Sequence, residues 1–283
     1  MGWFSHAWRA ALGAALLVGV PGAAVAGGGV YGGVQFLMLA PKINSDGFNQ
    51  VFYDEVDFSL VGTEGSFEDD LEGGVRFVFG AETCCGFGGR VRYFTFDNDV
   101  DYDGLWVGSG GSIPVQGQSA IDVDALDLEV TQRFDCCCWN MILGGGLRHG
   151  AVDILQPPNF FSGVSAVLNS GQTGVEFDGV GPTFSIGASR CLGYGLSVVG
   201  QARTSLLFGD IDMTRAFALT NRTIEDEFVQ VWEFQLGLNY QTRLGGHDVA
   251  GGVFWEAQRW DSDSNFLGDL GLHGLGLSGG VSF

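Results

Sequence analysis

Basic residues are scarce in this sequence. Lys and Arg together number 13 against 33 Asp and Glu, so the formal net charge is −20. Nucleic acid is not an expected partner, because neutralising phosphates requires a basic surface. Charged residues of both signs make up only 16% of the chain while hydrophobic residues make up 46%, a balance that excludes disorder. The 6 prolines, and a glycine pattern without a three-residue period, exclude collagen.

Glycine and aromatic residues are abundant instead. The 283 residues include 48 Gly, 23 Phe and 7 Trp. Glycine opposes helix formation, and aromatic residues favour strands. The composition therefore indicates an all-β chain.

Long apolar runs are absent outside the N-terminus. Arg9 precedes the apolar run Ala10–Val20, and Ala24–Ala26 has the small-x-small pattern of a signal cleavage site. We expect residues 1–26 to be a cleaved secretory signal and residues 27–283 to form one domain. A retained N-terminal anchor is the alternative, although the run is shorter than the roughly 20 residues that span a bilayer.

The dominant period after residue 27 is two. Between Gln230 and Tyr240, aromatic and leucine side chains occupy the even positions, while Glu233, Gln235 and Asn239 fall at odd positions. Such alternation predicts strands with one apolar and one polar face. We expect ten strands, at about 30–40, 71–82, 87–97, 120–134, 138–150, 176–190, 194–209, 228–243, 247–259 and 269–283. Val51–Val61 is a further candidate strand, so eight and twelve strands remain open.

Short and long connections alternate between these strands. The short ones are Thr83–Gly86, Asp135–Cys137, Cys191–Gly193 and Leu244–Gly246, and the long ones are acidic. This is typical of an antiparallel up-and-down transmembrane β-barrel with short periplasmic turns and long acidic extracellular loops. A soluble lipocalin-type barrel has the same period. The low charged fraction and the terminal strand that ends at Phe283 favour the outer membrane.

Six segments of the predicted strands and turns form a recognisable set: Gly144–Arg148, Phe177–Pro182, the glycine-rich hairpin Leu192–Ser197, Ser205–Gly209, Val253–Gln258 and Gly271–Leu275. Together they resemble the Legionella-type major outer membrane protein family. The resemblance covers most of the chain and implies a pore-forming barrel in the outer membrane. It supplies no catalytic residues. The clustered cysteines and strongly acidic loops depart from the family pattern, so they leave ion selectivity and partners open.

Six cysteines fall at or beside the predicted short turns: Cys84, Cys85, Cys136, Cys137, Cys138 and Cys191. In an oxidising compartment, disulfides between neighbouring turns are the expected state. Free thiols are one alternative. A zinc site is another, although the usual metal-ligand spacing is missing.

Charged residues share the polar faces of the predicted strands. If the apolar faces contact lipid, these residues line the lumen: Arg76, Arg90, Arg92, Asp127, Glu129, Arg133, Arg203, Glu233 and Glu256. Ten strands enclose a narrow interior. Such charges either set the selectivity of a narrow channel or form a polar core that holds the barrel together.

Carboxylates alternate in one predicted outer loop. Asp99, Asp101 and Asp103 precede Gly104 as in the opening of a calcium loop, but Gly110 stands where the bidentate Glu belongs. A weak cation-binding loop and a hydrated loop near lipopolysaccharide cations are both possible. The runs Glu68–Asp70 and Glu225–Glu227 extend the same negative rim.

No catalytic pattern surrounds the histidines His149, His247 and His273, so we expect no enzyme activity. We also expect no cofactor. The sequence favours a narrow pore or porin-like channel for small solutes or cations. The alternative is a non-conducting structural or adhesive barrel that displays acidic loops. Outer-membrane lipid and lipopolysaccharide are the expected partners, and an oligomer is possible.

Overall fold

The computed structural model describes residues 28–44, 52–53, 60–67, 70–108, 111–156, 173–214, 222–262 and 269–283. The predicted signal, residues 1–26, lies outside this part of the chain. Among the described residues, no helix is long and apolar enough to cross a membrane.

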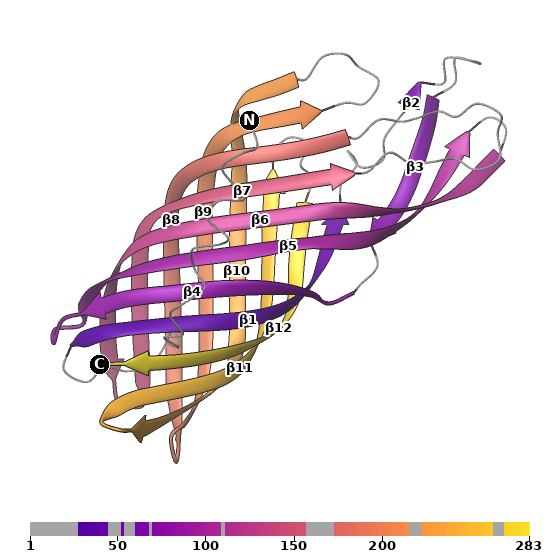
Figure 1. The fold of residues 1–283 in the computed structure, drawn as a ribbon. Helices are drawn as coiled ribbons and strands as arrows, with labels where there is room; N and C mark the ends of the chain where they lie inside the picture. Colours follow the sequence, from indigo (N-terminus) through magenta and orange to yellow (C-terminus); the bar gives the residue numbers. More distant parts are fainter. Residues whose placement is uncertain are drawn as a thin grey trace.

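Ten antiparallel strands close into a barrel, as the sequence predicts (Figure 1). They are β1 (Gly29–Asn44), β4 (Glu72–Glu82), β5 (Phe87–Gly108), β6 (Gly111–Cys136), β7 (Trp139–Gln156), β8 (Thr173–Gly193), β9 (Leu196–Thr214), β10 (Arg222–Leu244), β11 (His247–Ser262) and β12 (Asp269–Ser282). Each strand from β4 onward pairs with its neighbour in the chain. Pairing of β1 with both β4 and β12 closes the ring.

Two short strands occupy the connection between β1 and β4. β2 (Phe52–Tyr53) pairs with β3 (Leu60–Phe67), and β3 pairs with the outer part of β5. They arise because β4 begins at Glu72, whereas the outer half of β5 continues past it and leaves an edge for β3. Of the candidate strand at Val51–Val61, the described residues 52–53 and 60–61 belong to this small sheet beyond the barrel.

The predicted loop between residues 97 and 120 is instead a long hairpin. β5 continues to Gly108, and β6 begins at Gly111, with Asp99 opposite Ala120 and Asp103 opposite Gln116. The acidic residues of this segment recur at every second position, which is the period of a β-strand, and the segment does form a strand. Figure 1 shows the β5–β6 hairpin projecting from the barrel together with β2 and β3.

Tight turns join the strands at the opposite end of the barrel. Gly86, Gly245 and Gly246 supply positive φ values of 78°, 62° and 91°. The turn between β8 and β9 lies at Tyr194–Gly195 rather than at the predicted Cys191–Gly193. A register shift after Cys191 carries β8 past the expected end of the strand.

The two faces of the barrel wall differ in polarity. Outward side chains such as Phe184, Trp232, Leu236 and Leu275 are exposed and apolar, although each belongs to a strand whose alternate residues are buried. An apolar outer band around a charged interior is the arrangement of a transmembrane barrel. The wall therefore has its charges inside, in contrast to a soluble lipocalin-type barrel.

Candidate functional site in the barrel lumen

The middle of the lumen holds a network of charged side chains, here called the central charge cluster. Its nine members come from seven strands, and each is at most 7% exposed. They are Arg76, Arg90, Arg92, Arg148, Arg203, Asp127, Glu129, Glu233 and Glu256. Buried charges of this number are tolerated only where ion pairs offset the loss of hydration.

Asp127 lies at the centre of the cluster. Arg148 donates to its carboxylate from Nε at 2.6 Å and from Nη2 at 3.0 Å. Arg92 and Arg203 approach the same carboxylate, each at 3.2 Å. Glu233, across the lumen, accepts from Arg92 Nη2 at 3.0 Å and from Arg148 Nη2. Three guanidinium groups therefore share two carboxylates.

Glu129 forms a second centre beside Asp127. Arg90 Nε donates to it at 2.7 Å and Arg203 Nη1 at 2.8 Å. The Ser185 hydroxyl donates at 2.9 Å and accepts from Arg90 Nη2 at 3.1 Å. A side chain at Gly144 would collide with the Ser185 hydroxyl, so glycine on the inner face of β7 leaves room for this contact.

Arg76 and Glu256 form the third centre, on the β4–β11 side. Arg76 Nη1 donates to Glu256 at 2.8 Å and to Gln35 at 2.8 Å. Gln235 and Gln258 donate to the same carboxylate. The Arg76 guanidinium also lies 5.0 Å from the centre of the Phe94 ring, within cation–π range. The glutamine amides thus supply the hydrogen bonds to the Glu256 carboxylate that Arg76 alone does not provide.

Eight of the nine residues that the sequence places in the lumen belong to the central charge cluster. The ninth, Arg133, pairs with Glu82 at 2.8 Å, nearer the short turns. Arg148 is the member that the sequence reasoning missed. The sequence held a signal for it, because Met141, Leu143 and Leu147 are apolar residues at odd positions, whereas Arg148 falls at an even position.

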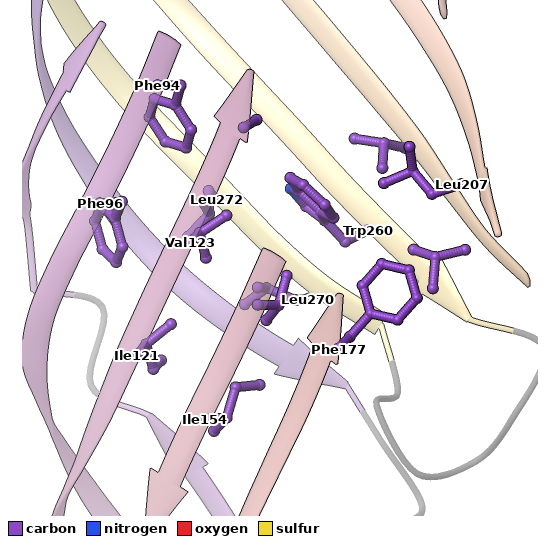
Figure 2. Close-up of a cluster of buried hydrophobic side chains, with 14 of the residues drawn as sticks. Phe94, Phe96, Ile121, Val123, Ile154, Phe177, Leu207, Trp260, Leu270 and Leu272 are labelled. Carbon is purple, nitrogen blue, oxygen red and sulfur yellow. The ribbon is translucent and has the colours of Figure 1, made fainter. Parts of the chain in front are cut away.

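A buried apolar cluster fills the lumen on the long-loop side of these charges (Figure 2). Its largest side chain is Trp260, which is fully buried, as are Phe96 and Phe177. Inward positions of β1, β5, β6, β7, β8, β9, β10, β11 and β12 contribute to it. A side chain at Gly150 would approach the Trp260 ring to 3.0 Å, so this glycine makes room for the indole. The expected polar lumen is therefore apolar in this half.

The half of the lumen next to the short turns contains a cavity. It has a volume of about 60 Å³, and both polar and apolar groups line it. Gln35, Arg90 and Gln235 lie at its inner end, against the central charge cluster, whereas Asn140 lies next to the β6–β7 turn. The lumen thus has three layers: a cavity, a charged layer and an apolar layer.

A row of carboxylates crosses the outer wall on the long-loop side of the apolar band. Cross-strand pairing places Asp97, Asp122, Asp153, Glu176 and Asp212 side by side on β5 to β9. Partial burial raises the pKa of Glu176, and the neighbouring Asp153 and Asp212 charges raise it further. Like charges directly opposite one another destabilise a sheet. We call this the outer acidic row.

The residues of the predicted cation-binding loop lie on a strand. Asp99, Asp101 and Asp103 follow one another along the extended backbone of β5, and not around the curved loop that a calcium site of this kind requires. Among the described residues, no group of three or more His, Cys, Asp or Glu side chains is placed to hold a metal ion. The calcium-loop geometry is therefore not formed.

All six cysteines lie in the described part of the chain, at the short-turn end, and all six are free and exposed. The predicted disulfides are not supported. The adjacent Cys84 and Cys85 sulfurs lie 3.9 Å apart, well beyond the length of a disulfide bond. Neighbouring cysteines in a chain point apart unless the backbone is strained, which explains this separation.

The three histidines of the barrel lie on its outside or at its rim. His149 pairs with Asp178 at 3.1 Å on the outer wall. His273 is exposed on β12, and His247 packs edge-on against Phe283 beside the β10–β11 turn. None of them lies in the central charge cluster.

Comparison with known proteins agrees with this architecture. Residues 31–262 match the family model described as the Legionella pneumophila major outer membrane protein precursor. No curated protein matches the sequence.

Two solved structures similar to the chain are of outer-membrane proteins. The outer membrane protease OmpT from Escherichia coli aligns with a TM-score of 0.56 at 9% identity, over 90% of this chain and 97% of OmpT. OprG from Pseudomonas aeruginosa aligns with a TM-score of 0.37 at 11% identity, over 89% of this chain and 96% of OprG. At 9% identity the likeness to OmpT shows a shared fold alone. Because the family match spans most of the chain, the protein belongs to the Legionella major outer membrane protein family and resides in the outer membrane.

Proposed function

We propose that this protein is a closed outer-membrane barrel that holds an acidic surface at the long-loop end of its wall. The narrow pore expected from the sequence needs a continuous polar path. The apolar cluster is the observation that favours closure instead, because its side chains are buried to 0% exposure at Phe96, Ile121 and Trp260.

The charged layer supports the same proposal. Ion pairs join strands on opposite sides of the lumen, such as Arg92 on β5 with Glu233 on β10. An ion that crossed this layer would have to separate buried pairs, and breaking one costs about 3–5 kcal/mol. The two occluding layers lie one behind the other along the lumen.

The displayed surface consists of the outer acidic row and the hairpin that continues it. Asp97, Asp153 and Asp212 are exposed on the outer wall. Beyond them, β5 and β6 extend into the projecting hairpin, with β3 on its edge. A negative surface of this kind attracts cations and repels anionic partners. We propose lipid on the apolar band as one neighbour and, beside the acidic row, lipopolysaccharide held through its associated cations as the other.

Single-channel recording in a planar bilayer tests closure. We expect the refolded mature protein to give no discrete current steps over a series of salt concentrations. The double variant Trp260→Gly, Phe177→Gly removes two aromatic rings of the apolar layer, and we expect it to leak. The matched variant Trp255→Gly, Phe184→Gly removes exposed rings from the outer wall and should stay silent.

The result that contradicts closure is a stepwise current from the unaltered protein that grows with salt concentration. That result would favour the narrow channel. Heat-dependent migration on a detergent gel shows that each variant is folded before it is recorded.

A further inference from the structure

The central charge cluster has an excess of positive charge. It contains five arginines and four carboxylates, and the nearby Arg133–Glu82 pair is neutral. Among the described residues, no further carboxylate joins the cluster. An uncompensated charge in a low-dielectric interior is costly, so such a site attracts an anion.

The excess charge is accessible from the cavity. Arg90 lines its inner end. The Nε and Nη2 atoms of Arg90 are engaged by Glu129 and Ser185, whereas Nη1 donates to none of the described residues. A guanidinium edge with an unused donor is suited to a carboxylate.

The cavity wall also carries a buried polar atom without a partner. Asn239 lines it at 3% exposure, and its Oδ1 is buried with no hydrogen-bond partner in the described part of the chain. Gln201, Ser189 and Ser278 add further polar groups. A buried acceptor without a partner needs a donor, which a bound water supplies and a carboxylate does not, so this end of the cavity is suited to water. A volume of about 60 Å³ limits a ligand to a few heavy atoms and a few waters.

We propose that this cavity binds a small monoanionic carboxylate that enters from the short-turn end of the barrel, with Arg90 as its cationic partner. One bound monoanion balances the cluster at five positive and five negative charges. Short turns face the periplasm in bacterial barrels, so the site samples periplasmic solutes. This inference is independent of whether the barrel conducts.

Ligand-observed NMR with the refolded protein in detergent tests the site. Acetate is the probe, and acetamide is its neutral counterpart of nearly equal size. We expect saturable binding of acetate in low-chloride buffer and at least tenfold weaker binding of acetamide. Equal binding of the two, or no saturable acetate binding, would overturn the proposal.

Two changes in the cluster have opposite expected effects. Arg90→Gln leaves four arginines and four carboxylates, so acetate binding should weaken at least tenfold. Glu129→Gln raises the excess positive charge, so acetate affinity should increase several-fold. Unchanged affinity in both variants would contradict the role of the excess charge.

Gln201→Glu covers the case in which the cluster variants do not fold. Gln201 lies on the cavity wall outside the central charge cluster, and it is only half-buried. A carboxylate at this position repels the ligand, and we expect about tenfold weaker acetate binding. Gln201→Asn is the matched neutral control. Unweakened acetate binding by folded Gln201→Glu would overturn the cavity as the site.

Discussion

Arg148 on β7 donates to Glu233 on β10, three strands away around the barrel. The same guanidinium holds Asp127 on β6, so one side chain ties three parts of the wall together. The contact with Asp127 joins two paired strands, whereas the contact with Glu233 crosses the lumen and therefore resists collapse or opening of the barrel cross-section. A β-ladder alone does not supply such contacts.

Arg148→Met should lower the free energy of unfolding by about 3–5 kcal/mol, because it leaves Asp127 and Glu233 with fewer cations in a buried site. Arg259→Met is the matched control. Arg259 is exposed and pairs with Asp269 at 2.7 Å, so its removal should cost under about 1 kcal/mol. Urea unfolding in lipid vesicles, followed by tryptophan fluorescence, measures both. Equal losses in the two variants would argue against a stabilising role of the cluster.

Trp260→Ala should destabilise the barrel by about 3–5 kcal/mol, since it leaves a cavity in the apolar layer. Trp255 lies on the same strand, but its ring is 47% exposed on the outer wall. Trp255→Ala should therefore lower the free energy of unfolding by clearly less than Trp260→Ala does. Circular dichroism during denaturation compares the two without depending on the tryptophan signal. A larger loss for Trp255 would mean that the inner packing of the lumen is loose.

Glu176→Gln should stabilise the protein by about 0.5 kcal/mol at neutral pH, because it removes a like charge between Asp153 and Asp212. The pKa of Glu176 is raised in the folded state, chiefly by burial. The folded state therefore gains stability from the protonated form at acid pH and loses it as the pH rises through that pKa.

The advantage of Glu176→Gln should accordingly be small at pH 4 and grow towards pH 7. Added salt should reduce it by screening. Denaturant titrations at several pH values and salt concentrations give this profile. A gain that is independent of both pH and salt would show that charge repulsion in the outer acidic row is not its cause.

Cys85 should react with iodoacetamide more slowly than Cys191 near neutral pH. A hydrogen bond with Cys84 raises the pKa of the Cys85 thiol, and the thiolate is the reactive form. Cys84→Ala should raise the reaction rate of Cys85 and abolish this difference. Peptide mass spectrometry over a labelling time course, without reductant, measures each site. It should also find all six cysteines labelled, and an unlabelled pair that reacts only after reduction would indicate a disulfide.

The strand pattern was readable from the sequence because alternate residues face lipid and lumen. In β10, Trp232, Phe234 and Leu236 mark the outer face without ambiguity, and Glu233 marks the inner one. The bounds were less predictable at the long-loop end. At that end the outer face of the strands is also polar, as at Asp97 and Asp122. A strand that lies beyond the apolar band therefore has the same polar composition as a loop, and its sequence does not distinguish the two.

The apolar layer was missed for a related reason. Val229 and Val231 alternate in phase with Glu233, which places them inside, yet valine by itself also fits the lipid face. Only the phase set by the charges distinguishes the two. Contacts between distant strands, such as Arg76 with Glu256, depend on strand tilt and register, and no local pattern encodes them.

The pairing of β1 with β12 bears on how the barrel is assembled. Tyr31 lies opposite Ser282, so the contact that closes the ring joins the two ends of the described chain. Until this pairing forms, β1 and β12 are edge strands, and their free backbone groups can pair with other chains. Contacts between such distant residues also form slowly. During assembly, pairing of β12 with β1 therefore competes with aggregation through these open edges.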